Sequence, residues 1–444
     1  MAGASAFCMA FLAMAMGPNV ALAQEEAAEA PAPEVKKVYP MNFGLSGEVE
    51  GTVKFDKSGL AKMQEADKDG KMKDLPMGVY GDYSASMGFD FSYKGVQTKI
   101  SIERAGMAIN VDEAWGDVEF IDGLHLRGGR MGVGLANHDW IWDQTVEAMR
   151  LSYAKSGFYV GFTTVLHQNG ADYMKNGAFY HNALKLSYQI NDMIGLHAFY
   201  TSNLKNAELP ATAATPTVLA SDFYNLSNIN FGANFAFAGI VDGYLDFYYQ
   251  FGKKPGFVNP ANGDDIKIGA YSLDLNVGIK IIDGLKANVG FFMLSKNGDD
   301  ADKYGAFERI WGGNQGDEGI GFCSDKAIGG RGLFNESIGL SYGYKAFSSS
   351  LTMNFAQIME NEGLVDDKGD DLGKSMGAAL DLELGYQFKE WFKLGAELNL
   401  NFASKTAANL NGIAAPGLDD YNKVPMAFAL TATFSPSFNF SVNK

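Results

Sequence analysis

The chain has 444 residues, a formal net charge of −16 and a mean hydropathy of −0.10, with 53 Gly, 32 Phe and 20 Tyr but only 12 Pro. This acidic balance argues against nucleic acid as a partner, because binding to phosphates needs a basic surface. No stretch after residue 23 is apolar enough and long enough to form a membrane helix.

The first 40 residues divide into two segments. Residues 1–23 contain an apolar run that ends in Ala21-Leu22-Ala23 before Gln24, the pattern of a cleavable secretory signal, although no Lys or Arg precedes the run. Residues 24–40 are rich in Ala, Glu and Pro and predict a flexible tail in the periplasm. Cleavage would leave Cys323 as the single cysteine, so we expect an unpaired loop thiol and no intramolecular disulfide.

From Met41 to the end, candidate strands alternate with two kinds of connection. Short turns such as Lys94-Gly95, Ser156-Gly157 and Asp283-Gly284 alternate along the chain with connections that are mostly longer and more polar, the longest being 297–333. A single up-and-down sheet that closes short hairpins on one edge and long ones on the other has this rhythm. The predicted fold is therefore an all-β, transmembrane, antiparallel up-and-down barrel over 41–444, with short periplasmic turns and long extracellular loops. We count about 18 strands, and 16 is the alternative. The expected strands are 42–55, 81–93, 96–103, 109–121, 124–133, 146–155, 158–167, 178–190, 193–203, 226–238, 244–252, 266–281, 285–296, 334–345, 348–359, 374–388, 391–403 and 424–434.

The segment 271–297 shows the two faces of such a hairpin most clearly. Leu273, Leu275 and Val277 alternate with polar or small residues, and a second strand with the same period follows Asp283-Gly284. Both strands are longer than the five or six residues usual in soluble sheets and approach the ~9–11 that cross a bilayer. If the apolar face contacts lipid, the polar face must line a lumen. Aromatic residues near strand ends, such as Tyr386 and Trp391, predict an interfacial belt.

Alternation also predicts which charged residues face the lumen. Charges of both signs in one cavity indicate a water-filled interior, because a dry core would not tolerate them. Near charge balance inside and acidic loops outside suggest weak cation preference at most. The residues expected to line the lumen are Lys99, Glu113, Asp117, Glu119, Lys185, Asp246, Asp274, Lys280, Lys286, Asp381, Glu383, Lys393 and Glu397.

The segment from Met41 to the aromatic final stretch MAFALTATFSPSFNFSVNK resembles Gram-negative outer-membrane porins. The resemblance is one of pattern, and 18 strands lie nearer to the substrate-specific and alginate-export-like barrels than to the general porins with 16. The chain ends in Ser441-Val442-Asn443-Lys444 and not in the terminal aromatic usual for such families. In these porins the third outer loop often folds inward, and here that loop is 134–145. The resemblance therefore implies a pore constriction, whose candidate residues are Arg127, Arg130, Arg150, His138, Asp139, Trp140, Trp142 and Asp143. A rim hairpin that touches no solute is the alternative.

These observations predict a channel for passive diffusion of ions, sugars or oligosaccharides, in contact with the outer-membrane bilayer, with a homotrimer left open as its assembly. An adhesin or structural barrel that uses its long loops to bind polymers or cells is the alternative function. The discriminating feature is whether 297–333 blocks the lumen or projects outward. We expect no enzymatic activity, no cofactor and no metal site, since no catalytic motif is present, His167 and His181 lack further ligands, and 65–70 is an incomplete calcium loop.

Overall fold

The structure is a computed structural model, and it describes most of the chain from Met41 to Val442. The signal peptide and the tail predicted for residues 1–40 lie outside the described residues, and all described residues belong to one compact unit, Pro40–Lys444. The gaps within this unit are 57–63, 67–71, 75–77, 106–107, 136–142, 168–177, 207–225, 259–264, 299–302, 308–329, 367, 411–425 and 443–444.

The described chain is almost entirely β structure. Its main sheet contains 20 strands, of which β16 (Lys303–Tyr304) is a two-residue strand and β22 (Ser437–Val442) continues β21 along β1, so 18 strands form the wall. These are β1 (Met41–Asp56), β4 (Gly78–Tyr93), β5 (Val96–Ala105), β6 (Ala108–Ile121), β7 (Leu124–Gly134), β8 (Asp143–Lys155), β9 (Phe158–His167), β10 (Ala178–Asn191), β11 (Ile194–Asn206), β12 (Leu226–Phe237), β13 (Val241–Val258), β14 (Asp265–Ile282), β15 (Leu285–Leu294), β17 (Leu333–Tyr344), β18 (Phe347–Ile358), β19 (Ser375–Lys389), β20 (Phe392–Ala403) and β21 (Met426–Phe434).

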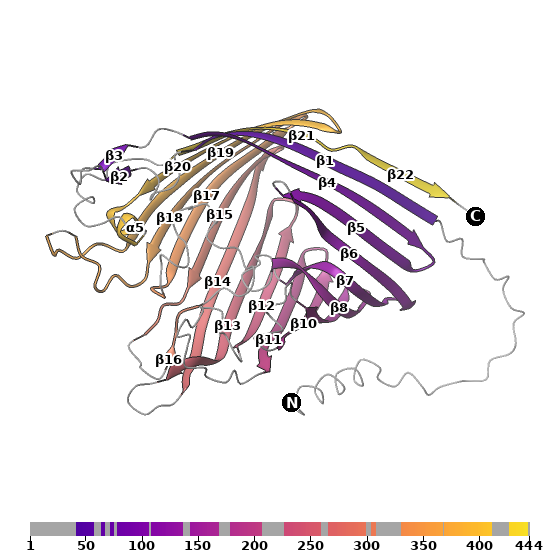
Figure 1. Ribbon diagram of the computed structural model, residues 1–444, viewed down its shortest axis with the longest axis horizontal. Coiled ribbons are helices and arrows are strands. Elements are labelled where there is room, and N and C mark those ends of the chain that lie inside the picture. Colours follow the sequence, from indigo (N-terminus) through magenta and orange to yellow (C-terminus); the bar gives the residue numbers. More distant parts are fainter. Residues whose placement is uncertain are drawn as a thin grey trace, which may run out of the picture. The chain divides into compact units, whose positions relative to one another are not determined.

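The wall closes on itself through its first strand. β1 pairs antiparallel with β4 along one edge and with β21 and then β22 along the other, and Figure 1 shows β1 between β4 and β21. Each of the other wall strands pairs antiparallel with its neighbours in sequence, from β4 to β21. Closure removes both free edges and so satisfies the backbone hydrogen bonds of every wall strand. The predicted closed up-and-down barrel of 18 strands is confirmed.

The short hairpins use two kinds of turn. Lys94-Gly95 and Ser156-Gly157 have positive φ at both residues, with values of 48° and 78° and of 51° and 81°, which is the pattern of a type I′ turn. At Asp283-Gly284 only the glycine has positive φ, and the register shifts between Lys280 and Ile282, so this hairpin closes through a bulge. The dipeptide predicted the turn, whereas the bulge is a finding of the structure.

Several elements differ from the expected ones. The final stretch forms two strands, because the pairing with β1 is interrupted at Ser435-Pro436 and resumes at Ser437. Within the predicted connection 56–79, β2 (Gln64–Ala66) and β3 (Met72–Asp74) form a separate two-stranded sheet. β5 and β6 are joined by only residues 106–107, so this connection, expected among the longer ones, is short. Each deviation moves an element boundary and leaves the barrel order unchanged.

The two faces of the wall have opposite chemistry. On β13, Tyr248 is fully buried while its neighbours Phe247 and Tyr249 are 39% and 42% exposed. Exposed apolar residues recur in the same way at Leu351, Met353 and Phe355 on β18, where Asn354 between the last two is buried. In a closed barrel the buried face is the interior, so the exposed apolar face is the outside. An outer surface of this kind is typical of barrels surrounded by lipid.

The inner face is packed at the end of the strands that carries the long connections. Leu294, Leu333 and Ile358 form one cross-strand row, and each is at most 4% exposed. Phe307 from the longest connection packs edge-on against Tyr248, with ring centroids 6.3 Å apart. The helix α5 (Lys405–Leu410) contributes buried residues to the same cluster. Part of several connections therefore folds inside the barrel. The described part of the chain contains no helix with the length and hydropathy of a membrane span.

Candidate channel lumen

The strand register places the predicted lumen residues on one face of the wall. Cross-strand partners in a sheet point to the same side. Asp246, which is fully buried, pairs with Asp274, and the same row runs through Phe292 to Asn335, both about as buried. Rows of this kind connect all thirteen charged residues named above, from Lys99 on β5 to Glu397 on β20. That they line a conducting passage remains a prediction.

A basic cluster occupies this face on β7 and β8. Arg127 and Arg150 are cross-strand partners, and His125 lies two residues from Arg127. The Asp117 carboxylate bridges the cluster, accepting from Arg127 Nε at 2.9 Å through one oxygen and lying 2.7 Å from His125 Nδ1 through the other. Arg127 also stacks on the Trp115 ring, 3.9 Å from its centroid. Arg150 Nε donates to Thr163 Oγ1 at 3.0 Å, so two arginines are set against one carboxylate and the cluster carries a net positive charge.

An acidic cluster lies on β19 and β20, composed of Asp381, Glu383 and Glu397. Glu383 pairs directly with Glu397 across the two strands, and Asp381 lies one inward position further along β19. Their described hydrogen bonds come from neutral side chains, namely Ser350 Oγ to Glu383 at 3.2 Å, Asn354 Nδ2 to Asp381 at 3.3 Å, and Asn399 Nδ2 to Asp381. The amide and hydroxyl donors hold the carboxylates of Asp381 and Glu383 in place without neutralising them. This part of the wall therefore presents negative charge.

A buried polar network joins β11, β12 and β13. Asp246 Oδ1 lies 2.6 Å from His197 Nε2 and accepts a hydrogen bond from Asn230 Nδ2 at 2.9 Å. Gly232 makes room for this contact, because a Cβ there would lie 2.1 Å from both Asp246 Oδ1 and His197 Nε2. Asp246 and Asn230 are fully buried, so this network is built into the wall.

Lysine and aspartate pairs mark the end of the lumen that carries the short turns. Lys286 donates to Asp242 at 2.6 Å, and Lys280 pairs with Asp283 at 2.6 Å in the turn itself. The hydrogen bond from Lys280 holds the pKa of the exposed Asp283 carboxyl below its usual value. Further along the same face, Lys99 pairs with Glu113.

Only part of the predicted constriction is described. Arg127 and Arg150 lie on the inner face, as stated above. Arg130 pairs with Glu147, which shares the outer face of β8 with Met149 and Leu151, so Arg130 also lies on the outer face. The Nε of Arg130 donates to the backbone oxygens of Val111 and Asp112 on β6. His138, Asp139, Trp140 and Trp142 lie outside the described residues, and for Asp143 only the backbone pairing with Gly134 is described. The structure thus brings together two of the three arginines.

Two features of the inner face were missed at the level of sequence. One is the apolar cluster beneath the connections, which includes Met131, Val133 and Val146. The other is a belt of fully buried amides and hydroxyls, among them Thr201 and Asn228. The alternation rule assigns apolar residues to the lipid face, so it misplaces apolar residues that face inward. On β7 the sequence signal for the buried cluster is that Met131 and Val133 alternate with glycine and not with polar residues.

Toward the short turns, by contrast, the inner face of β14 to β20 consists largely of small residues. These inward positions are Gly278, Gly290, Ser337, Gly339, Ser341, Gly343, Ser348, Ser350, Gly385 and Gly395. Small side chains keep the lumen wide, and charges of both signs on the same face favour water inside it. Within the described ranges, no three His, Cys, Asp or Glu side chains are close enough together to hold a metal ion.

Comparison with known proteins adds evidence on the fold. No protein-family model and no curated protein matches the sequence. Among solved structures, the chain is similar to the outer membrane protein OprD from Pseudomonas aeruginosa, with 12% identity and a TM-score of 0.54 over 90% of this chain and 94% of that one. It is also similar to P. aeruginosa OccK5 (OpdH), with 12% identity, a TM-score of 0.52, and coverage of 90% and 98%. Acinetobacter baumannii OccAB4 matches with 10% identity, a TM-score of 0.51, and coverage of 90% and 99%. The chain therefore has the 18-stranded barrel fold of these outer-membrane proteins of Gram-negative bacteria.

Proposed function

We propose that the protein is an outer-membrane porin, a water-filled channel through which small hydrophilic solutes such as ions, sugars or oligosaccharides diffuse passively. The observation that carries the proposal is the contrast between the faces of the closed wall. The outer face is apolar, and the inner face toward the short turns combines small residues with basic and acidic clusters. A barrel of this size with a polar interior conducts unless something fills it.

The inward packing of Phe307 supports this function over an adhesin. Phe307, in the described part of the connection 297–333, contacts the inner face of the wall at Tyr248. The connections that fold inside would narrow the passage at the outer end, which fits a channel selective for small solutes.

The first test is planar-bilayer conductance of the refolded chain from Gln24, followed by swelling of proteoliposomes in sugars of increasing size. We expect stable conductance steps and swelling that falls with solute size. Folding and insertion are checked by heat-modifiable migration on a gel. Folded, inserted protein that gives neither conductance nor swelling would refute the channel and favour the adhesin.

We also propose export to the outer membrane, with residues 1–23 as a signal peptide and 24–40 as a periplasmic tail. Mass spectrometry of protein from isolated outer membranes should find an N-terminus at Gln24. A homotrimer is the assembly to test first, by cross-linking in membranes.

A further inference from the structure

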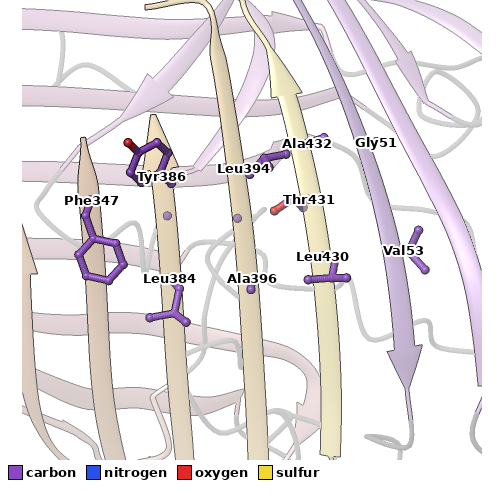
Figure 2. Close-up of a pocket in the computed structure, with 12 residues that line it drawn as sticks. Gly51, Val53, Phe347, Leu384, Tyr386, Leu394, Ala396, Leu430, Thr431 and Ala432 are labelled. Carbon is purple, nitrogen blue, oxygen red and sulfur yellow. The ribbon is translucent and has the colours of Figure 1, made fainter. Parts of the chain in front are cut away.

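The outer face carries an apolar concavity of about 510 Å³ over β18, β19, β20, β21 and β1. Figure 2 shows the side chains around it. Its walls include Leu384, Leu430 and Val53, which are 40% to 47% exposed and belong to the outer face. The concavity is therefore separate from the lumen, on the surface that the proposed function turns toward lipid.

The register explains why the surface is hollow at this place. One cross-strand row of outward residues runs Phe347, Tyr386, Leu394, Ala432 and Gly51, and the next runs Leu384, Ala396, Leu430 and Val53. Ala432 and Gly51 are neighbours in the first row, Ala396 lies diagonally from Ala432 in the second, and these three small residues form the floor. A Cβ added at Gly51 would have no neighbour within 4 Å, so the space above it is open.

Bulky residues border the concavity on both sides along the strands. The row toward the long connections contains Leu398, Phe428 and Phe55, and the rings of Phe428 and Phe55 are 5.9 Å apart. The row toward the short turns contains Phe392 and Phe434. The hollow is thus confined to two rows of an otherwise filled apolar surface.

An aromatic and basic rim lies beside the concavity, at the short turns. Trp391 packs on Phe434 with ring centroids 5.1 Å apart, as expected for residues at a membrane interface. Lys389 is exposed and pairs with Phe392 on the outer face, three residues from Tyr386. Lys345, which precedes Phe347 by two residues, lies with its Nζ 5.1 Å from the centroid of the Tyr344 ring. The hollow is therefore at the depth of acyl chains, and the lysines are at the depth of headgroups.

We propose that the concavity seats one acyl chain of an anionic phospholipid, whose phosphate lies beside Lys345 and Lys389. The apolar lining suits a hydrocarbon chain, and the basic rim suits a phosphate. A second copy of this chain would bring the same two lysines at its own short turns, so charge favours the lipid. The inference rests on the membrane placement in the proposed function.

Native mass spectrometry of the full chain, released from detergent micelles during titration with phosphatidylglycerol, tests the proposal. The double variant Ala396→Leu/Ala432→Leu fills the floor, and the matched control is Ala198→Leu, an outward alanine on β11. Burial of about two methylene groups contributes roughly tenfold in affinity. We expect the filled variant to bind about tenfold more weakly than the wild type and the control to bind as the wild type does.

The headgroup contact is tested by Lys345→Gln/Lys389→Gln, with Lys94→Gln as control, because Lys94 also stacks on a tyrosine at a short turn. The lysine variant should lose its preference for phosphatidylglycerol over phosphatidylcholine. Equal lipid binding by the filled variant and the wild type would overturn the proposal. An oligomer that dissociates only in the filled variant would also overturn it, in favour of contact between copies. Heat-modifiable migration on a gel checks that every variant is folded. If the filled variant binds lipid more weakly but conducts as the wild type does, the loss of lipid binding is separate from any failure of the channel function.

Discussion

Neutralising the acidic cluster on β19 and β20 should reduce the preference of the channel for cations. The change is Asp381→Asn, Glu383→Gln and Glu397→Gln in one chain, which preserves side-chain size and the donors from Ser350 and Asn354. An ion in the lumen about 10 Å from a carboxylate interacts with it by ~0.4 kcal/mol in water. Three such charges sum to about 1.2 kcal/mol, or roughly a sevenfold loss of cation occupancy. The basic cluster of Arg127 and Arg150 then dominates the field.

The assay is the reversal potential across a planar bilayer in a salt gradient. We expect weak cation preference in the wild type and a shift toward anions in the triple variant, large at 0.01 M salt and small at 1 M, where the Debye length falls from about 30 Å to about 3 Å. Glu390→Gln, an exposed acid in the adjacent short turn, is the control and should leave the potential unchanged. If the triple variant and the wild type have the same reversal potential at low salt, these carboxylates do not face the ion path.

Three further predictions concern stability and the outer mouth. Gly232→Ala places a Cβ against Asp246 and its histidine partner. Breaking a buried charged contact of this kind lowers the free energy of unfolding by about 3–5 kcal/mol. The measurement is a lower urea midpoint in a variant that keeps the circular dichroism of the barrel. Tyr248→Ala removes a fully buried ring beneath the longest connection and should cost about 3–5 kcal/mol while increasing conductance, and unchanged conductance would show that this packing does not narrow the pore. Lys296 hydrogen-bonds to Glu360 and lowers the pKa of the Glu360 carboxyl below its ordinary value of 4.5. This link between two connections is therefore fully present above pH 4.5 and is lost as the pH falls through the lower pKa that Glu360 has in the folded protein. Acidification should therefore raise current noise in the wild type, and Lys296→Gln should show the same noise at neutral pH; quiet recordings from that variant would rule out the link as a stabiliser of the mouth.

The alternation of residues carried most of the information about the wall. At Leu380, Leu382 and Leu384 the apolar period of two places one face toward lipid, and the structure has this face outside. A slip by one residue would turn all of these leucines inward, so the pattern specifies the register strongly. The charged residues between them, such as Asp381 and Glu383, were assigned to the inner face by the same rule. Local pattern was sufficient here because each strand needs only its own two faces to be recognised.

The rule was insufficient where a strand meets a folded-in connection. On β7, Met131 and Val133 are apolar yet face inward, because other parts of the chain cover them and exclude water. Arg130 directly precedes Met131 in the sequence and was assigned to the pore, but the register turns it outward. A charged or apolar side chain near the end of a strand does not by itself reveal whether it contacts lipid, water or a loop.

The sequence by itself determined the order of hairpins and the two faces of the wall and favoured 18 strands over 16, because these depend on residues close together in the chain. Only the tertiary structure decided which charges meet, since Asp117 joins Arg127 and His125, and Asp246 joins His197, through pairing across strands. The apolar packing of Phe307 on Tyr248 and the concavity above Ala396 and Ala432 were decided in the same way. Both arise from residues brought together over long sequence separations, and a period of two contains no information about such contacts.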